Sequence, residues 1–116
     1  MTQVTIYHNP KCSKSRETLA LLESKRISPR VVEYLKTPPT AGELDRILKL
    51  LDLEPRALMR RNEAEYRDLG LDDQKLTRAQ LIKAMVDNPR LIERPIVLAN
   101  GKAVIGRPPA NVLKIL

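Results

Sequence analysis

Hydrophobic and polar residues alternate at the start of the chain and then change to a helical spacing. Residues 3–7 alternate and are rich in β-branched side chains, which predicts a strand. Residues 13–26 place Leu19 and Leu22 on one side of a helix, and residues 30–34 again have the pattern of a strand. Two strands joined by one helix form a βαβ unit, so we expect these strands to be parallel.

The middle of the chain has the pattern of several helices in succession. Capping boxes that begin at Thr40 and Thr77 predict two helices, which end near residue 51 and near residue 87. Two shorter helical segments are expected between them, at residues 55–61 and 63–69. We therefore expect a helical insertion over about residues 40–88.

The end of the chain predicts a β-hairpin followed by a last helix. The apolar runs at residues 92–99 and 102–105 flank the pair Asn100-Gly101, and Asn-Gly between such runs is a strong hairpin signal. Residues 110–116 have the pattern of a helix. A βαβ half and a ββα half joined by helices indicate an α/β protein with a thioredoxin-like fold, enlarged by the helical insertion.

Composition narrows the classes of protein to which the chain can belong. Its 116 residues suit a single domain over residues 1–116, and 42% hydrophobic content is ordinary for a globular protein. The net charge of +7 favours anionic partners, but 3% aromatic content offers no stacking platform and disfavours nucleic acid. We see neither a membrane-spanning run nor a signal peptide, so we expect a cytoplasmic protein without membrane association.

The candidate chemistry lies where the first strand gives way to the first helix. Cys12, the only cysteine, is expected at a helix N-terminus, where free amides and the helix dipole stabilise the reactive thiolate. Three neighbouring cations would also lower the thiol pKa: Lys11, Lys14 and Arg16. His8 could assist as a cation or a proton shuttle, and Ser15 could donate a hydrogen bond to the sulfur. A lone cysteine is more often a small buried hydrophobe, but lysine and serine on both sides disfavour that alternative.

Three arginines have settings that suit an anion site. Arg94 precedes Pro95 at the start of the hairpin and Arg107 follows its end, so an antiparallel hairpin brings the two together. Arg60 lies near the end of a short helical segment, and the pattern does not place it near Cys12. The guanidinium group suits tetrahedral oxyanions, although each arginine could equally be a surface cation. We also expect the Arg94–Pro95 bond to be cis.

The chain carries a pattern seen in one known family. It opens with Tyr7-His8-Asn9-Pro10-x-Cys12-x-x-Ser15-Arg16, which resembles the opening of the glutaredoxin-linked arsenate reductases of the ArsC family, within the ArsC/Spx-like thioredoxin-fold superfamily. The resemblance continues through five further segments: Tyr34-Leu35-x-x-Pro38-Pro39, Arg56-Ala57-Leu58-x-Arg60, Leu69-Gly70-Leu71, Arg94-Pro95-Ile96-Val97 and Arg107-Pro108. It covers nearly the whole chain.

The resemblance implies an oxidoreductase that reduces arsenate to arsenite. Cys12 would attack arsenate to form a thiol–arsenic adduct, which glutathione and glutaredoxin resolve as reducing co-substrates. Arg60, Arg94 and Arg107 match the family's oxyanion ligands. His8 and Ser15 match positions that tune the thiol. No tightly bound cofactor and no metal is expected, since one cysteine and one histidine are too few for a closed metal site, and we expect a monomer.

Two alternatives stay open. A related thiol reductase, acting for example on a glutathione mixed disulfide, would need Cys12 but would tolerate the loss of Arg60 and Arg107. A regulator of the Spx type would share the fold and bind RNA polymerase. Such regulators characteristically sense oxidation through a Cys-x-x-Cys pair, and here Ser15 stands at the second position, which excludes an intramolecular disulfide switch.

Overall fold

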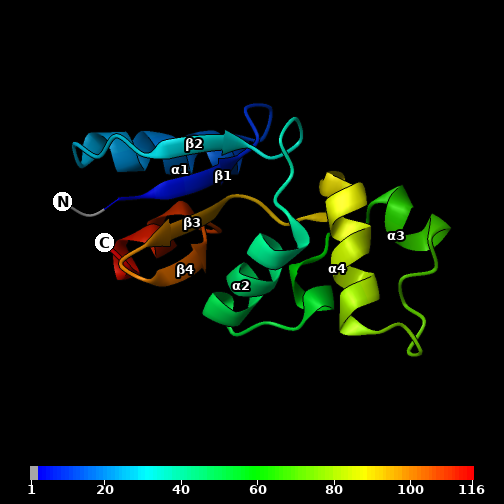
Figure 1. Cartoon of the computed structure of the whole chain (residues 1–116). Coiled ribbons are helices and arrows are strands. Elements are labelled where there is room, and N and C mark those ends of the chain that lie inside the picture. Colours follow the sequence, from blue (N-terminus) through cyan, green and yellow to red (C-terminus); the bar gives the residue numbers. More distant parts are fainter. Residues whose placement is uncertain (1–2) are drawn as a thin grey trace. The chain divides into compact units, whose positions relative to one another are not determined.

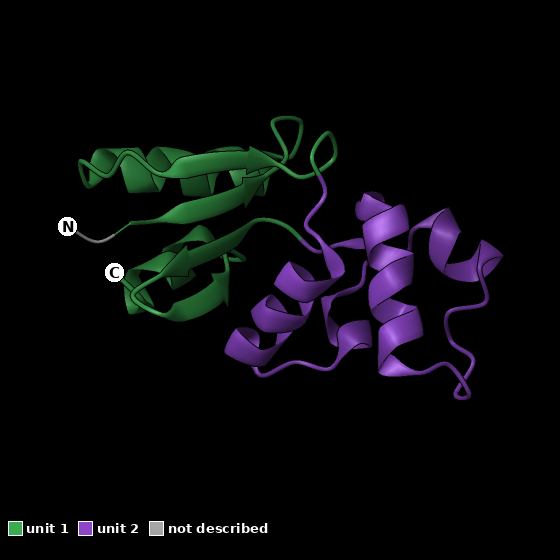
Figure 2. Cartoon of the chain, viewed as in Figure 1, with its two compact units in different colours: residues 1–37, 94–116 green, residues 38–93 purple. Residues whose placement is uncertain are grey.

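The computed structural model describes residues 3–116, and the chain divides into two compact units (Figures 1 and 2). One unit is formed by the residues up to Thr37 together with Arg94–Leu116, and the other is Pro38–Glu93. The helical insertion expected at residues 40–88 lies within the second unit. That the whole chain forms one domain stays a prediction.

The first unit is built on a four-stranded mixed sheet. Its elements are β1 (Thr5–His8), α1 (Ser13–Ser24), β2 (Arg30–Glu33), β3 (Ile96–Ala99), β4 (Lys102–Ile105) and the 3₁₀ helix η3 (Pro109–Lys114). The strand order is β2-β1-β3-β4; β1 and β2 are parallel, as predicted, and the other pairs are antiparallel (Figure 1). This is the thioredoxin-like layout expected from the order of the elements.

One face of this sheet carries the core of the first unit. Ile6 of β1 and Val97 of β3 are fully buried and pack with Leu22 of α1 and Val112 of η3. The alternation of the strands places these apolar side chains on one face, and α1 and η3 cover that face. The core therefore ties the helix that follows Cys12 to both halves of the sheet.

Helix α1 ends two residues earlier than predicted. Arg26 has a left-handed backbone with φ 62°, and the amide of Ile27 donates to the carbonyl of Leu22 at 3.1 Å. A left-handed residue with such a bond is a common helix C-terminus. The last segment also differs, because the helix expected at residues 110–116 is the 3₁₀ helix Pro109–Lys114.

The second unit is helical. Its elements are α2 (Ala41–Leu51), η1 (Pro55–Leu58), α3 (Ala64–Asp68), α4 (Arg78–Asp87) and η2 (Pro89–Leu91). Both predicted capping boxes are present, and α2 packs against α4 through buried leucine, isoleucine and methionine side chains. Among residues 3–116, no helix is long and apolar enough to span a membrane.

One expectation for this region is corrected. The segment at residues 55–61 is only a four-residue 3₁₀ helix, Pro55–Leu58. The first hairpin strand begins at Ile96, directly after Pro95, and Ile92 at the start of the apolar run forms an isolated antiparallel bridge with Met59. That bridge joins two stretches of the second unit and removes Ile92 from the hairpin.

Candidate functional site

Cys12 lies at the N-terminus of α1, in the loop that follows β1. The amide of Cys12 donates to the carbonyl of Asn9 at 3.0 Å, and the amide of Lys11 donates to the Asn9 side-chain oxygen at 3.0 Å. Cys12 itself is the N-cap residue, with extended backbone. Its side chain is only 9% exposed. The thiol of Cys12 is thus held in a tight turn directly before the free amides of the helix.

The surroundings of Cys12 lower the pKa of its thiol. Burial by itself would raise this pKa, but the backbone amides of Ser15 and Lys14 and the charge and hydrogen bond of Arg94 together outweigh it. Lys14 acts here through its amide, while its ammonium group lies 3.5 Å from the Glu17 carboxylate. The expected direction of the shift agrees with the sequence analysis, but its source is the helix N-terminus and Arg94 rather than the side chains beside Cys12.

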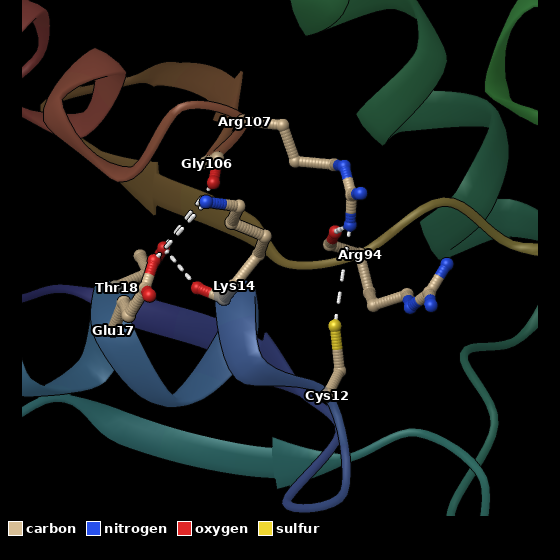
Figure 3. A network of polar contacts seen from close by, with 7 residues as sticks. All are labelled: Cys12, Lys14, Glu17, Thr18, Arg94, Gly106 and Arg107. Carbon is tan, nitrogen blue, oxygen red and sulfur yellow. Dashed lines mark hydrogen bonds and ion pairs between the residues drawn. The ribbon is translucent and has the colours of Figure 1, made fainter.

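Arg94 and Arg107 both lie beside Cys12. Figure 3 shows the Arg107 guanidinium facing the sulfur, with Arg107 Nη1 at 4.0 Å from Cys12 Sγ. The same nitrogen donates to the backbone carbonyl of Arg94 at 3.4 Å. Arg94 contributes its own positive charge and a hydrogen bond to the thiol. The two arginines therefore place positive charge next to the sulfur, where an anionic substrate would need it.

The hairpin register brings these arginines together. Ile96 pairs with Ile105 as the first rung of the hairpin, and the amide of Gly106 donates to the carbonyl of Pro95 at 2.9 Å. Arg94 and Arg107 lie two residues beyond that rung, one on each side of the hairpin, and so come together as the antiparallel hairpin predicted. The Arg94–Pro95 bond is cis, as expected, and Arg107–Pro108 is a second cis bond that the sequence analysis did not predict.

His8 and Ser15 form a buried pair below the loop. His8 Nδ1 lies 2.6 Å from Ser15 Oγ, and the same oxygen accepts from the amide of Asn9 at 2.9 Å. Burial lowers the pKa of His8, Glu33 raises it and Arg16 lowers it, with a net shift downwards. A lowered pKa favours neutral His8, which can accept the Ser15 proton. The lowered pKa disfavours a cationic His8 beside the thiol. The Ser15 hydroxyl, which was expected to donate to the sulfur, instead contacts His8 and the Asn9 amide. Ser15 acts on Cys12 through its backbone amide.

Arg60 belongs to the second unit and is bound there. Its Nη1 lies 2.8 Å from Glu63 Oε1, and the other oxygen of Glu63 lies 2.9 Å from Arg90 Nη2. The Arg60 amide donates to the carbonyl of Leu91 at 2.7 Å. This network holds the guanidinium of Arg60 in one place. Its approach to Cys12 stays a prediction.

Sequence analysis missed two residues that contact this region, Thr18 and Gly106. Thr18 is fully buried, and its hydroxyl lies 2.8 Å from the carbonyl of Lys14 and 3.3 Å from that of Gly106. Their signals were present but weak. Thr18 shares the buried helix face of Ser15 and Leu22 at spacings of three and four residues, and Gly106 directly precedes Arg107.

The fold and this site define the class of the protein: a thioredoxin-like protein with one thiol at a helix N-terminus, next to arginines from a hairpin that follows a cis proline. The sequence model of the ArsC family matches residues 7–115. The chain therefore belongs to the ArsC family.

The relatives agree with this assignment. A protein of Escherichia coli K12 with the name "Uncharacterized protein YfgD" is 57% identical over 98% of this chain and 97% of its own length. The arsenate reductase of Haemophilus influenzae is 51% identical over 97% of this chain and 98% of its own. Among solved structures, an arsenate reductase from Vibrio cholerae has 55% identity and a TM-score of 0.96, covering 99% of this chain and 98% of its own.

Proposed function

We propose that this protein is an arsenate reductase that reduces arsenate to arsenite through a thiol–arsenic adduct on Cys12. The observation that carries the proposal is the thiol of lowered pKa at a helix N-terminus, with Arg107 Nη1 at 4.0 Å from its sulfur. Close relatives over nearly the full length carry the name arsenate reductase. Arsenate is a tetrahedral oxyanion, and such an anion suits a thiolate beside guanidinium groups.

The first step is attack of the Cys12 thiolate on arsenic. A sulfur–arsenic bond forms, one arsenic–oxygen bond breaks, and that oxygen leaves as water after taking up protons. Arg94 and Arg107 stabilise the negative charge on the arsenate oxygens as the bond forms. Arg60 is the third oxyanion ligand in this proposal, and the Glu63 carboxylate positions its guanidinium.

The adduct is then reduced by two electrons. Two thiols supply them and end as a disulfide. Water then breaks the sulfur–arsenic bond, so that arsenic leaves as arsenite and Cys12 is regenerated as the thiol. In our proposal these thiols are those of glutathione and glutaredoxin, which makes the enzyme dependent on a reducing compartment such as the cytoplasm. It acts as a monomer and uses neither a metal nor a tightly bound cofactor.

His8 and Ser15 prepare the nucleophile in this proposal. The Ser15 hydroxyl accepts from the Asn9 amide and lies against His8 Nδ1, so it fixes the loop that carries Cys12. The Ser15 amide lowers the thiol pKa directly. Loss of the Ser15 hydroxyl would then act on Cys12 through the loop, because the amide is retained in every variant.

The test is arsenate-dependent oxidation of NADPH, coupled through glutathione, glutathione reductase and glutaredoxin. We expect activity in the wild-type protein and none in Cys12→Ser, which keeps the size of the side chain but replaces the sulfur. Circular dichroism checks that the variant is folded. Activity that persists in folded Cys12→Ser would exclude the thiol mechanism. A wild-type protein with a reactive thiol but no arsenate turnover would instead favour another thiol substrate.

A further inference from the structure

We propose that Thr18 and Gly106 are positioning residues that hold the Arg107 guanidinium beside the Cys12 sulfur. Thr18 lies on α1 and Gly106 directly follows β4, so they join the helix that Cys12 caps to the strand that leads into Arg107 (Figure 3). All four residues belong to the first unit. The value of this placement for catalysis rests on the proposed function.

The contact between Thr18 and Gly106 is too close for any other residue at position 106. A Cβ added at Gly106 would lie 2.7 Å from Thr18 Oγ1, 3.0 Å from Thr18 Cγ2 and 2.9 Å from Pro95 Cγ. A β-branched side chain in a helix and a proline ring cannot move away at low cost. Glycine is required here for space and not for an unusual backbone angle. Strand and helix therefore approach each other as closely as a backbone allows.

The Thr18 side chain cannot easily move, because it is fully buried and its hydroxyl lies against two backbone carbonyl groups. It lies 2.8 Å from the Lys14 carbonyl, one turn earlier in α1, and 3.3 Å from the Gly106 carbonyl. Rotation of the side chain would leave a buried hydroxyl without these acceptors, which costs free energy. The hydroxyl thus sets where the end of β4 lies on α1.

The backbone position of Gly106 constrains that of Arg107, because the two residues are adjacent in the chain. The Gly106 amide donates to the Pro95 carbonyl at 2.9 Å, and the Arg107 amide donates to the Ile105 carbonyl at 2.9 Å. Arg107 Nη1 then lies 3.4 Å from the Arg94 carbonyl and 4.0 Å from Cys12 Sγ. Arg107 is otherwise an exposed residue with a long side chain, so its backbone position decides how often the guanidinium lies beside the sulfur.

Alkylation of Cys12 measures this placement without any substrate. Cys12 is the only cysteine, so iodoacetate and iodoacetamide report on one sulfur. Both reagents form the same type of sulfur–carbon bond and release iodide, but only iodoacetate is an anion. The ratio of the two rate constants at one pH cancels the thiolate fraction and reports the positive charge next to the sulfur. Arg107→Gln gives the value of this ratio without the Arg107 charge.

We expect Gly106→Ala to lower the ratio of iodoacetate to iodoacetamide rates by about threefold to fivefold, the effect of one exposed charge pair, to the level of Arg107→Gln. Gly42→Ala is the matched control, because a Cβ there meets nothing within 4 Å. It should leave the ratio unchanged.

The proposal is overturned if folded Gly106→Ala keeps the wild-type ratio. Should Gly106→Ala not fold, Thr18→Val takes its place, since it deletes the hydroxyl but keeps the shape. A ratio that falls about twofold in Thr18→Val supports the proposal, and an unchanged ratio overturns it. Alkylation needs no arsenate, glutathione or glutaredoxin, so this failure is distinct from a failure of the proposed function.

Discussion

The contribution of Arg107 to arsenate reduction can be worked out from one distance. Unit charges 4 Å apart attract by ~1 kcal/mol in water and by about 4 kcal/mol near a protein surface of effective dielectric constant 20. Arg107 Nη1 lies 4.0 Å from Cys12 Sγ. When the thiolate attacks arsenic, the oxygens of arsenate come to lie in this region beside the guanidinium. Because Arg107 is exposed, we take the lower part of that range, roughly 1–2 kcal/mol.

Arg107→Gln should therefore lower kcat/KM for arsenate by about fivefold to thirtyfold. The measurement is the coupled NADPH assay over a range of arsenate concentrations. Arg107→Lys keeps the charge but loses the planar fork of donors, so its value should lie between those of Arg107→Gln and wild type. A kcat/KM for Arg107→Gln within twofold of wild type would refute the reasoning, and Arg107 would then be only a surface cation.

Three further predictions concern the pKa values and the ion pairs. Arg94→Gln removes a charge and a hydrogen bond that favour the thiolate, so the pKa of Cys12 should rise. The pH profile of iodoacetamide alkylation should then move to higher pH. An unchanged profile would contradict this prediction. The pKa of His8 is lowered from 6.5 in the folded state, so its contribution to stability is fully present above pH 6.5 and is lost as the pH falls through the folded pKa. Between pH 7.5 and pH 5, the free energy of unfolding, measured with urea, should fall less in His8→Asn than in the wild-type protein. An equal fall in both proteins would argue against this reasoning. Glu63→Gln weakens a partly buried ion pair with Arg60 and should cost about 1–2 kcal/mol of unfolding free energy, measured with urea; no change in the urea midpoint would mean that the pair does not contribute to stability.

Local patterns in the sequence predicted elements of both units. The capping boxes, the Asn100-Gly101 turn and the alternation around Ile6 each depend on neighbours within a few residues, and each is present in the structure. The pairing of Ile92 outside the hairpin was not predicted. Its partner Met59 lies far away in the sequence, so no local pattern could reveal that bridge.

The candidate site was predicted in part for the same reason. Cys12 and the two hairpin arginines follow from local elements and from the antiparallel register, and the structure places them together. The roles of His8 and Ser15 were assigned from residue type and from the resemblance to the ArsC family. The structure shows that the two side chains contact each other. Burial lowers the pKa of His8 and so favours the neutral ring, which can accept the hydroxyl proton of Ser15.

The sequence by itself determined where Cys12 lies, because a helix N-terminus and a strand end are set by short-range periodicity and capping. It also determined that Arg94 and Arg107 meet, because a two-residue turn fixes the register of a hairpin. Only the tertiary structure decided which groups lower the pKa of Cys12 and how Arg107 is held. Those depend on burial and on the contact of Thr18 with Gly106, residues 88 positions apart. Such a contact exists only once helix and sheet share a core, so no local pattern of residues encodes its distance.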